Sequence, residues 1–520
     1  MKYMSLLTSG VGTYSKATKV NVAIVGAGMA GLVAGRLLLK AGFNVSLYEA
    51  SHRVGGRIRR LREGFTHDLY AEAGAMRIPQ EHELTKRLCK DFGCELVDFE
   101  EECDQTLIYV NGHRVRRADY QNGRSSFRGR YTDCGIAGTT VERVLTPIKK
   151  NFEKELRELT KCSDTELKQS ERLLRLDGIS WGEYLRAFVK DSSSWTGKIP
   201  IIDAKIKDGD VLHWGDLDLI RLEYGAADFR ASLLEFVRDH EMIKAGGKKQ
   251  IAGGMDLLPS SFIDSKRAGK HDLSSRVKYH ARVNEIVKVH RGREFEIHYE
   301  HTLTHSSHSE VADYVILAAP FSALTHVRLN TVLSAESLHA INTLHYENAT
   351  KIILEFSERF WAKQNITGGK SFTDLPVRWI HYPSRSQCGP NQRGLLLASY
   401  TWGDDSLRWG SLSEKDRIRF ALRDVAEVHG MPTEECRRLL VGGMSHSWAS
   451  DEYAFGAFAI FEPHQEKELY KNTWMPCEGI HFAGEHTSLK HAWIEGTVES
   501  GIRAAFEVFQ KAESNCTYNS

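Results

Sequence analysis

The sequence predicts an α/β fold, α+β over the whole chain, built from a nucleotide-binding unit, a mixed-sheet region and a helical insertion. Three observations predict it. A strand–turn–helix–strand pattern fills residues 21–50, amphipathic helical patterns dominate residues 111–240, and strand patterns return between residues 281 and 486. A chain of 520 residues is too long for one ordinary core and corresponds to about two to four domains.

The N-terminal pattern is a βαβ unit of the Rossmann-like kind. The apolar strand NVAIV (21–25) leads through GAGMAG (26–31) into a helix over 32–42, and a second strand follows at 45–50. A unit of about thirty residues has the size of a nucleotide-binding half.

Each residue of the glycine-rich turn has its own expected role. Gly26 permits the tight bend, Gly28 lets a pyrophosphate approach the backbone, and Gly31 allows close helix–strand packing. Met29 and Ala30 open the helix, whose free N–H groups would face the phosphates.

An acidic residue closes the second strand. Glu49 lies 18 residues after Gly31, where a carboxylate can bind ribose hydroxyls, and an acid at this place favours FAD or NAD over NADP. The alternatives are an ordinary glycine-rich turn or a membrane span over residues 20–39. Arg36 interrupts that apolar run, and its two halves have different periods, so the membrane interpretation is disfavoured.

The rest of the chain carries further helix and strand patterns. They predict helices at 147–162 and 229–240, a hairpin of 281–292 with 294–300 around Arg291–Gly292, a buried strand at 313–320, a second sheet from 350–357 and 394–402, and a last strand and helix at 479–486 and 496–511.

Nucleotide-binding patterns occur at the start, middle and end, so we expect domains that are discontinuous in sequence. The expected division is 20–76, 250–335 and 474–512 for cofactor binding, 77–110 and 336–473 for substrate binding, and 111–240 for a helical domain.

Composition excludes several classes of protein. The formal net charge is +1, from 69 basic and 68 acidic residues, so no general field favours nucleic acid or an anionic membrane surface. The nine cysteines form no CxxC pair, which disfavours a structural metal site. The N-terminus lacks the apolar core of a signal peptide, so a cytoplasmic or an already-processed secreted protein is expected.

Two further motifs distinguish FAD from NAD. ASHRVGGRIRR (50–60) adds a second glycine pair and Arg57 after the ribose-binding acid, and HFAGEHTSLKHAWIEGTVESGIRAA (481–505) follows near the C-terminus. Together they resemble the flavin amine oxidase superfamily. The resemblance implies that Arg57 approaches the pyrophosphate, that Glu485 binds the ribityl chain, and that the last helix directs its positive end at the flavin.

A longer series of motifs resembles the L-amino-acid oxidases within that superfamily. In chain order they are GAMRIP (74–79), AGGMDLLP (252–259), TKIIL (350–354), FTDLPVRWIHYP (372–383), SYTWGDD (399–405), SWASDEYAFGAF (447–458) and AGEHT with AWIEG (483–496). The match runs from about 20 to 510 and is thinnest in the helical stretch.

The resemblance assigns roles to residues around a substrate. Arg77 would pair with the substrate carboxylate through two parallel N–H···O bonds, and Tyr400 would add a third bond. Lys351 would hold a water near flavin N5, and it is the expected catalytic residue. Phe458 and Trp493 would flank the substrate amine.

The resemblance also places further residues against the cofactor, with Val283 contacting the adenine through its backbone only. They are Ala50, Gly56, Ala75, Met76, Val283, Trp448, Gly484 and Ile494, together with Arg77 and Trp493.

Several positions depart from the family pattern. Trp402 replaces an aliphatic residue and would narrow the side-chain pocket, and Ala492 stands where a glycine commonly precedes the tryptophan. Either Arg238 or His240 could reach the active-site entrance from the helical domain. Ala457 takes the place of the cysteine through which monoamine oxidases attach flavin, so a non-covalent FAD is expected.

The implied activity is oxidative deamination of an L-amino acid. A hydride would pass from Cα to flavin N5, water would convert the imino acid to a 2-oxo acid and ammonia, and O2 would become hydrogen peroxide. The expected partners are an L-amino acid and O2, with a homodimer or larger homo-oligomer as the assembly. The preferred amino acid stays open, since Trp402, Phe458 and Trp493 indicate an apolar pocket but basic-residue oxidases share the scaffold.

Other interpretations stay open at this point. The chain could be a monoamine or polyamine oxidase, a flavin-fold protein that only binds a partner, or, from the first motif alone, a nicotinamide dehydrogenase. Arg77 could bind one of the protein's own carboxylates, and Lys351 could lie on the surface of an edge strand. Tyr400, Phe458 and Trp493 could be ordinary packing residues.

Overall fold

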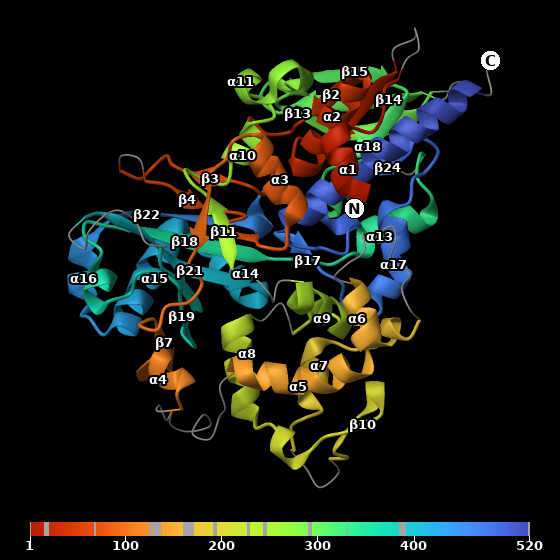
Figure 1. Ribbon diagram of the computed structural model, residues 1–520. Helices are drawn as coiled ribbons and strands as arrows, with labels where there is room; N and C mark the ends of the chain where they lie inside the picture. The colour runs from red at the N-terminus through yellow and green to blue at the C-terminus, as the bar shows by residue number, and fades with distance from the viewer. Residues whose placement is uncertain are drawn as a thin grey trace.

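The computed structural model describes residues 2–14, 20–66, 69–123, 127, 137–159, 171–190, 195–225, 229–242, 247–289, 294–329, 331–383 and 392–517. Three regions are visible in Figure 1: a parallel sheet with its helices at the top, a large mixed sheet at the left, and a group of helices below. The predicted class, a mixed α/β fold with a helical insertion, is confirmed.

The nucleotide-binding region is built on a five-stranded parallel sheet, in the order β12-β2-β1-β16-β24. Its strands are β12 (Val277–Lys278), β2 (Asn44–Tyr48), β1 (Asn21–Val25), β16 (Tyr314–Leu317) and β24 (Ile480–Phe482). All four residues of β16 are buried, as its wholly apolar sequence predicts for a central parallel strand.

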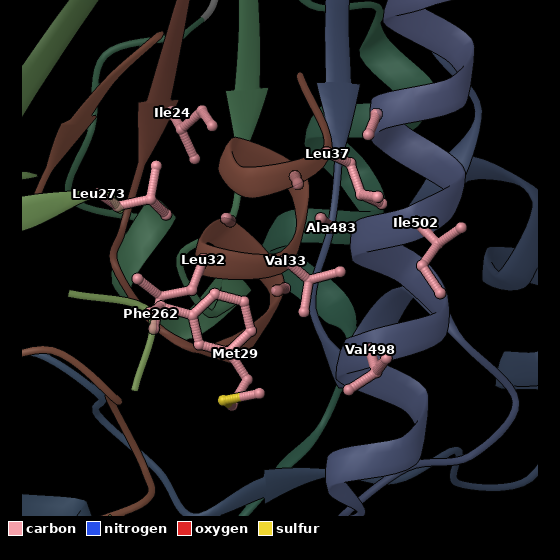
Figure 2. Close-up of a cluster of buried hydrophobic side chains, with 14 of the residues drawn as sticks. Ile24, Met29, Leu32, Val33, Leu37, Phe262, Leu273, Ala483, Val498 and Ile502 are labelled. Carbon is pink, nitrogen blue, oxygen red and sulfur yellow. The ribbon is translucent and has the colours of Figure 1, made fainter. Parts of the chain in front are cut away.

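Helix α2 (Met29–Ala41) packs against this sheet and against the C-terminal helix α18 (Ile494–Thr517), which also contacts the sheet. Figure 2 shows Val33 and Leu37 of α2 facing Val498 and Ile502 of α18. The contact is close because Gly501 of α18 has no side chain: a Cβ there would lie 2.6 Å from the carbonyl oxygen of Ala30. Residues far apart in sequence therefore share one core.

The second large sheet has seven strands in the order β22-β18-β21-β20-β19-β7-β8 and is mixed, since β19 and β7 pair in parallel. The strands are β22 (Leu440–Ser447), β18 (Ala349–Phe356), β21 (Gly394–Trp402), β20 (Trp379–His381), β19 (Lys370–Thr373), β7 (Leu107–Val110) and β8 (His113–Arg116). The prediction that residues 350–357 and 394–402 belong to a second sheet is confirmed by β18 and β21, which pair antiparallel.

In the described residues, two three-stranded antiparallel sheets and three strand pairs accompany the two large sheets. The sheets are β5 (Ile78–Pro79), β11 (Lys248–Ile251) and β6 (Leu96–Phe99), and β13 (Ala281–Lys288), β14 (Phe295–His301) and β15 (Ser307–Ala312). The pairs are β3 (Arg60–Leu61) with β4 (Ala71–Glu72), β9 (Lys198–Ile199) with β10 (Ala204–Lys205), and β17 (Tyr346–Glu347) with β23 (Phe458–Ala459). Strands β13 and β14 form the predicted hairpin, whose turn at 290–293 lies outside the described residues.

In the helical region, one predicted helix is wrong. The pattern at 147–162 predicts a single helix, whereas the structure has α5 (Ala137–Asn151) with Pro147 inside it, followed by α6 (Glu153–Leu159). Val144 and Ile148 are buried on either side of the proline, and this tertiary packing outweighs the lost hydrogen bond. Residues 160–162 lie outside the described residues.

The remaining helices surround these sheets. They are α1 (Lys2–Ser9), α3 (Glu83–Asp91), α4 (Arg117–Gln121), α7 (Trp181–Arg186), α8 (Trp214–Tyr224), α9 (Leu233–Met242), α10 (Leu257–Ser260), α11 (Ser265–Ala268), α12 (Phe321–Leu324), α13 (Ala335–Thr343), α14 (Gly403–Gly410), α15 (Glu414–His429), α16 (Thr433–Leu439) and α17 (Gln465–Trp474). Within the described ranges, no helix is both long and apolar enough to cross a bilayer. The apolar run at 20–39 divides between strand β1 and helix α2.

Candidate active site

A cavity of about 1250 Å³ runs through the junction of the three regions. It is larger than the roughly 300–1,000 Å³ of a site for one drug-sized ligand, so it has room for a dinucleotide and a second molecule. Every site residue predicted from the sequence lines this cavity except Gly31, which lies behind it.

The glycine-rich turn forms one end of the cavity. Gly26 has φ +103°, a conformation that favours glycine, and a Cβ on Gly31 would lie 2.1 Å from the Gly26 carbonyl oxygen. A Cβ on Gly28 would meet nothing within 4 Å, because the space in front of it is open. Gly28 is also the N-cap of α2 and provides no side-chain cap, which leaves the first N–H groups of the helix facing the cavity.

Glu49 stands directly after β2 at the same end. Its side chain is buried and accepts hydrogen bonds from the N–H groups of Ala27 (2.9 Å) and Ser51 (3.0 Å) and from the Ser51 hydroxyl (2.7 Å). These bonds fix the carboxylate in the cavity wall. Ala50 and Val283 line the cavity beside it.

Arg57 and Glu485 bind each other midway along the cavity. The Arg57 Nη1 donates to Glu485 Oε1 at 2.6 Å and to the Ala457 carbonyl at 3.1 Å. Glu485 also accepts the Ala492 N–H at 3.0 Å. Two residues predicted separately as cofactor ligands are therefore one buried ion pair.

The N-terminus of α18 opens onto the cavity, as the last motif predicts. Trp493, Ile494 and Thr497 all line it. Gly484, at φ +138°, and the buried Trp448 complete this part of the wall, and the Trp448 indole donates to the Ala73 carbonyl at 2.9 Å.

Lys351 lies on β18, which pairs with β22 on one side and β21 on the other, and it is buried, so the surface alternative is wrong. Its ammonium donates to the carbonyls of Gly74 (2.6 Å) and Glu72 (3.0 Å) and lies 4.7 Å from the centre of the Tyr400 ring. Burial lowers the pKa of Lys351 to about 7. Burial also raises the pKa of the neighbouring Glu72 carboxyl to about 7.

The face of the sheet that carries Lys351 presents an aromatic wall to the cavity. Directly paired residues share a face, and Lys351 pairs with Tyr400, which pairs in turn with Trp379. The Tyr400 and Trp402 rings meet edge to face at 5.5 Å, as do Trp402 and Phe458. Burial raises the pKa of Tyr400, so this phenol stays protonated as a hydrogen-bond donor.

Arg77 lines the cavity immediately before β5, and its side chain is 24% exposed. Its Nη1 donates to Glu101 Oε1 at 3.1 Å, so the alternative of an internal ion pair is realised in this structure. That single bond uses one Nη only. Among the described residues, no other side chain takes a hydrogen bond or ion pair from the Arg77 fork.

The helical region supplies the outer wall through α8 and α9. His240 lines the cavity and bonds Glu142 at 2.9 Å, whereas Arg238 is buried outside it, paired with Glu235 and Glu466. Of these two candidates, His240 therefore lies in the cavity wall and Arg238 does not. Acidic residues of this region also enter the wall: Glu223, Glu235 and Asp239.

Three further lining residues escaped the sequence interpretation. Lys248 begins β11 and binds Glu101 at 2.7 Å, while Lys370 and the buried His381 pair across β19 and β20. Burial lowers the pKa of Lys370 to about 8 and that of His381 well below its ordinary value. Trp379 and His381 are two residues apart in VRWIHYP, so the sequence could have predicted that both side chains lie on one face of a strand. Lys248 and Lys370 belong to no motif that would have singled them out.

These residues fit a dinucleotide such as FAD. Open space lies before Gly28 and the uncapped end of α2, which suits a pyrophosphate, and the fixed Glu49 carboxylate can accept ribose hydroxyls. No lining residue, all of them within the described part of the chain, is a cysteine.

The chain is similar to known proteins over most of its length. A family model described as flavin containing amine oxidoreductase matches residues 29–509. YobN of Bacillus subtilis (strain 168) is 34% identical over 500 residues, which cover 94% of each chain. The L-amino-acid oxidase of Siganus canaliculatus is 32% identical over 498 residues, covering 94% of this chain and 85% of the relative, and that of Bothrops atrox is 31% identical over 520 residues, covering 98% and 92%.

Solved structures share the fold at low sequence identity. Cyclohexylamine oxidase from Brevibacterium oxydans IH-35A superposes with a TM-score of 0.69 at 17% identity, covering 95% of this chain and 100% of that one. Wild-type putrescine oxidase gives 0.64 at 17%, covering 95% and 99%. The fold is that of the flavin amine oxidases, FAD is the cofactor, and the protein is an oxidoreductase that acts on amines or amino acids with O2. The chain belongs to the flavin-containing amine oxidoreductase family.

Proposed function

We propose that this protein is an L-amino-acid oxidase. It would convert an L-amino acid, O2 and water into a 2-oxo acid, ammonia and hydrogen peroxide. FAD, held non-covalently, supplies the acceptor for the two electrons that leave the substrate, and O2 takes them on as hydrogen peroxide. Arg77 carries the proposal, because a guanidinium in the cavity wall beside Tyr400 and Lys351 suits a substrate that has a carboxylate.

Arg77 and Tyr400 would bind that carboxylate together. A guanidinium can give it two parallel N–H···O bonds, and a protonated phenol can give a third. With the carboxylate fixed, only one face of Cα meets the flavin, and the L form is selected. Trp493 and Phe458 would flank the amine.

Lys351 would control a proton and a water molecule. The substrate amine would react in its neutral form, so no strong base is required to start the reaction. Burial lowers the pKa of Lys351 to about 7, and its Nζ can therefore hold or release a proton near neutral pH. We assign it to orienting the water that hydrolyses the imino acid.

The aromatic wall supports a substrate with an aromatic or large apolar side chain. Trp402, Phe458 and Trp379 present ring surface to the cavity. The acidic residues contributed by α8 and α9 favour, as the alternative, a substrate with a basic side chain. A peroxide assay with all twenty L-amino acids and their D forms ranks the two.

The predicted homodimer or larger assembly and the cytoplasmic location rest on the sequence and stay proposals.

Substitution of Arg77 tests the proposal. Arg77→Met should lower kcat/KM for the best amino acid by about 100-fold, because a charge-assisted bidentate partner contributes ~1.5–3 kcal/mol. Activity on a simple primary amine should not fall.

The matched control is Arg87→Met, which removes an arginine that pairs with Asp91 on the surface of α3. It should leave both activities unchanged. Retention of full kcat/KM on amino acids by Arg77→Met would sink the proposal and favour a monoamine or polyamine oxidase.

A further inference from the structure

Arg77 is held by a carboxylate of the protein itself. Arg77 Nη1 and Lys248 Nζ both donate to Glu101 Oε1, at 3.1 and 2.7 Å. The three residues meet at one end of the sheet β5-β11-β6. Arg77 precedes β5, Lys248 begins β11, and Glu101 follows β6 by two residues. The register places Lys248 between Pro79 and Phe99, which brings the three side chains together at the cavity wall.

The contact between Arg77 and Glu101 is incomplete. Only one Nη of Arg77 and one oxygen of Glu101 take part, and the Glu101 side chain is 33% exposed. A carboxylate that met the guanidinium with both oxygens would form two parallel bonds, which are stronger and more directional. Tyr400, in the same cavity, offers a further donor. A substrate carboxylate would therefore bind Arg77 more strongly than Glu101 does.

Lys248 makes an exchange of partners feasible. Leaving a half-buried carboxylate unpaired is costly, but Glu101 keeps its 2.7 Å bond to Lys248 when Arg77 turns away. Two more lysines, Lys351 and Lys370, line the same wall, and among the described residues they donate only to backbone carbonyls and a thioether sulfur.

We propose that Glu101 is an internal stand-in for the substrate carboxylate: it occupies Arg77 in the resting enzyme and yields it when a carboxylate-bearing substrate binds. The inference rests on the proposed function. It makes Glu101 a specificity-determining residue, because an amine without a carboxylate cannot displace Glu101 and meets an Arg77 that is already neutralised.

Binding of benzoate to the FAD-loaded enzyme tests this, measured by isothermal titration calorimetry alongside steady-state kinetics. Benzoate carries a carboxylate and no amine, so it reports on the clamp without turnover. Glu101→Gln keeps the size of the side chain and removes the competing charge. It should lower the Kd for benzoate and the KM for amino acids by about three- to fivefold, with kcat unchanged within about twofold.

Two variants accompany it. Asp98→Asn removes a carboxylate from the preceding strand β6, where it binds Lys249 on an exposed surface, and should change nothing. Glu101→Asp keeps the charge but shortens the side chain by one methylene, which moves the carboxylate away from Arg77. Its Kd for benzoate should lie between those of wild type and Glu101→Gln.

A Kd that is unchanged or raised in Glu101→Gln overturns the inference. If Arg77→Met abolishes benzoate binding while Glu101→Gln leaves it as in wild type, the proposed function stands and the inference alone has failed. If benzoate binds equally well with and without Arg77, both have failed.

Discussion

The buried Lys351 of the large sheet, proposed to act in catalysis, also lowers the stability of the folded protein when it is charged. Lys351 is 1% exposed, and within the described part of the chain its hydrogen-bond partners are the neutral backbone oxygens of Glu72 and Gly74 and the sulfur of Met76. Burial disfavours its charged form and lowers its pKa to about 7. Below that pH the folded protein must carry a buried ammonium.

A pH series of unfolding measurements should reveal this cost. In the unfolded chain lysine binds its proton up to about pH 10.4, so the unfolded state holds more protons above pH ~7 and wild-type stability rises with pH. The free energy of unfolding of Lys351→Met relative to wild type should therefore fall by about 2–3 kcal/mol between pH ~7 and ~9.5.

Urea titrations at three pH values within that range measure the difference. Lys363→Met, which removes an exposed lysine paired with Glu358, should show a constant difference. A constant difference for Lys351→Met as well would mean that Lys351 is not strongly shifted in the folded state.

The backbone conformation of Ala492 explains why glycine is common at this position in the family. Its φ is +63°, a left-handed conformation that costs most residues about 1–2 kcal/mol and glycine nothing. The same residue donates its N–H to Glu485, and that bond requires the turn. The position thus favours glycine for a backbone reason, and alanine is the smallest side chain that can replace it.

At the scale of elements, α9 positions the loop that carries Trp493. Glu235 binds His491 at 2.8 Å and Asp239 binds the Trp493 indole N–H at 2.7 Å. The two acids are four residues apart and lie on one face of the helix. Burial raises the pKa of Asp239, although the indole hydrogen bond opposes the shift.

Removal of the Asp239 acceptor should misplace Trp493. Asp239→Leu leaves a half-buried indole N–H without its acceptor, at a cost of about 1–3 kcal/mol, and should lower kcat/KM about 10- to 100-fold. Asp239→Asn keeps a carbonyl acceptor and should stay within about fivefold of wild type. Steady-state kinetics with tryptophan fluorescence measure both. Equal losses in the two variants would show that charge, and not the hydrogen bond, is what matters.

At the scale of the whole molecule, the cavity joins pieces from both ends of the chain. Gly26 and Glu49 come from the first fifty residues, and Glu485 and Trp493 from the last forty. A ligand that bridges such pieces binds the folded state alone, so it stabilises the fold by mass action.

Removal and return of the cofactor should show this coupling. FAD at a thousandfold excess over its Kd should stabilise the apoenzyme by about 4 kcal/mol, seen as a higher Tm, whereas NAD at the same concentration should not. Because no described lining residue is a cysteine, acid denaturation should release the FAD into the supernatant. Colour retained in the precipitate would contradict non-covalent binding.

Much of the fold could be predicted because its signals are local. The strand, turn and helix of residues 21–41 follow from apolar periodicity and from glycines whose roles are steric, and the structure confirms Gly26 and Gly31 in those roles. The helix at 147–162 could not be placed, since burial of Val144 and Ile148 against other elements overrides Pro147. The proposed division into domains stays a prediction.

The sequence by itself determined the fold class, the family and those residues of the cavity that belong to motifs with a fixed spacing, but not Lys248, Lys370 or His381. Only the tertiary structure decided what those residues bind. It joined Arg57 to Glu485, took Arg238 away from the cavity and brought Lys248 and Glu101 to Arg77. Such pairings depend on strand register and helix packing between segments far apart in the chain, and no local pattern records them.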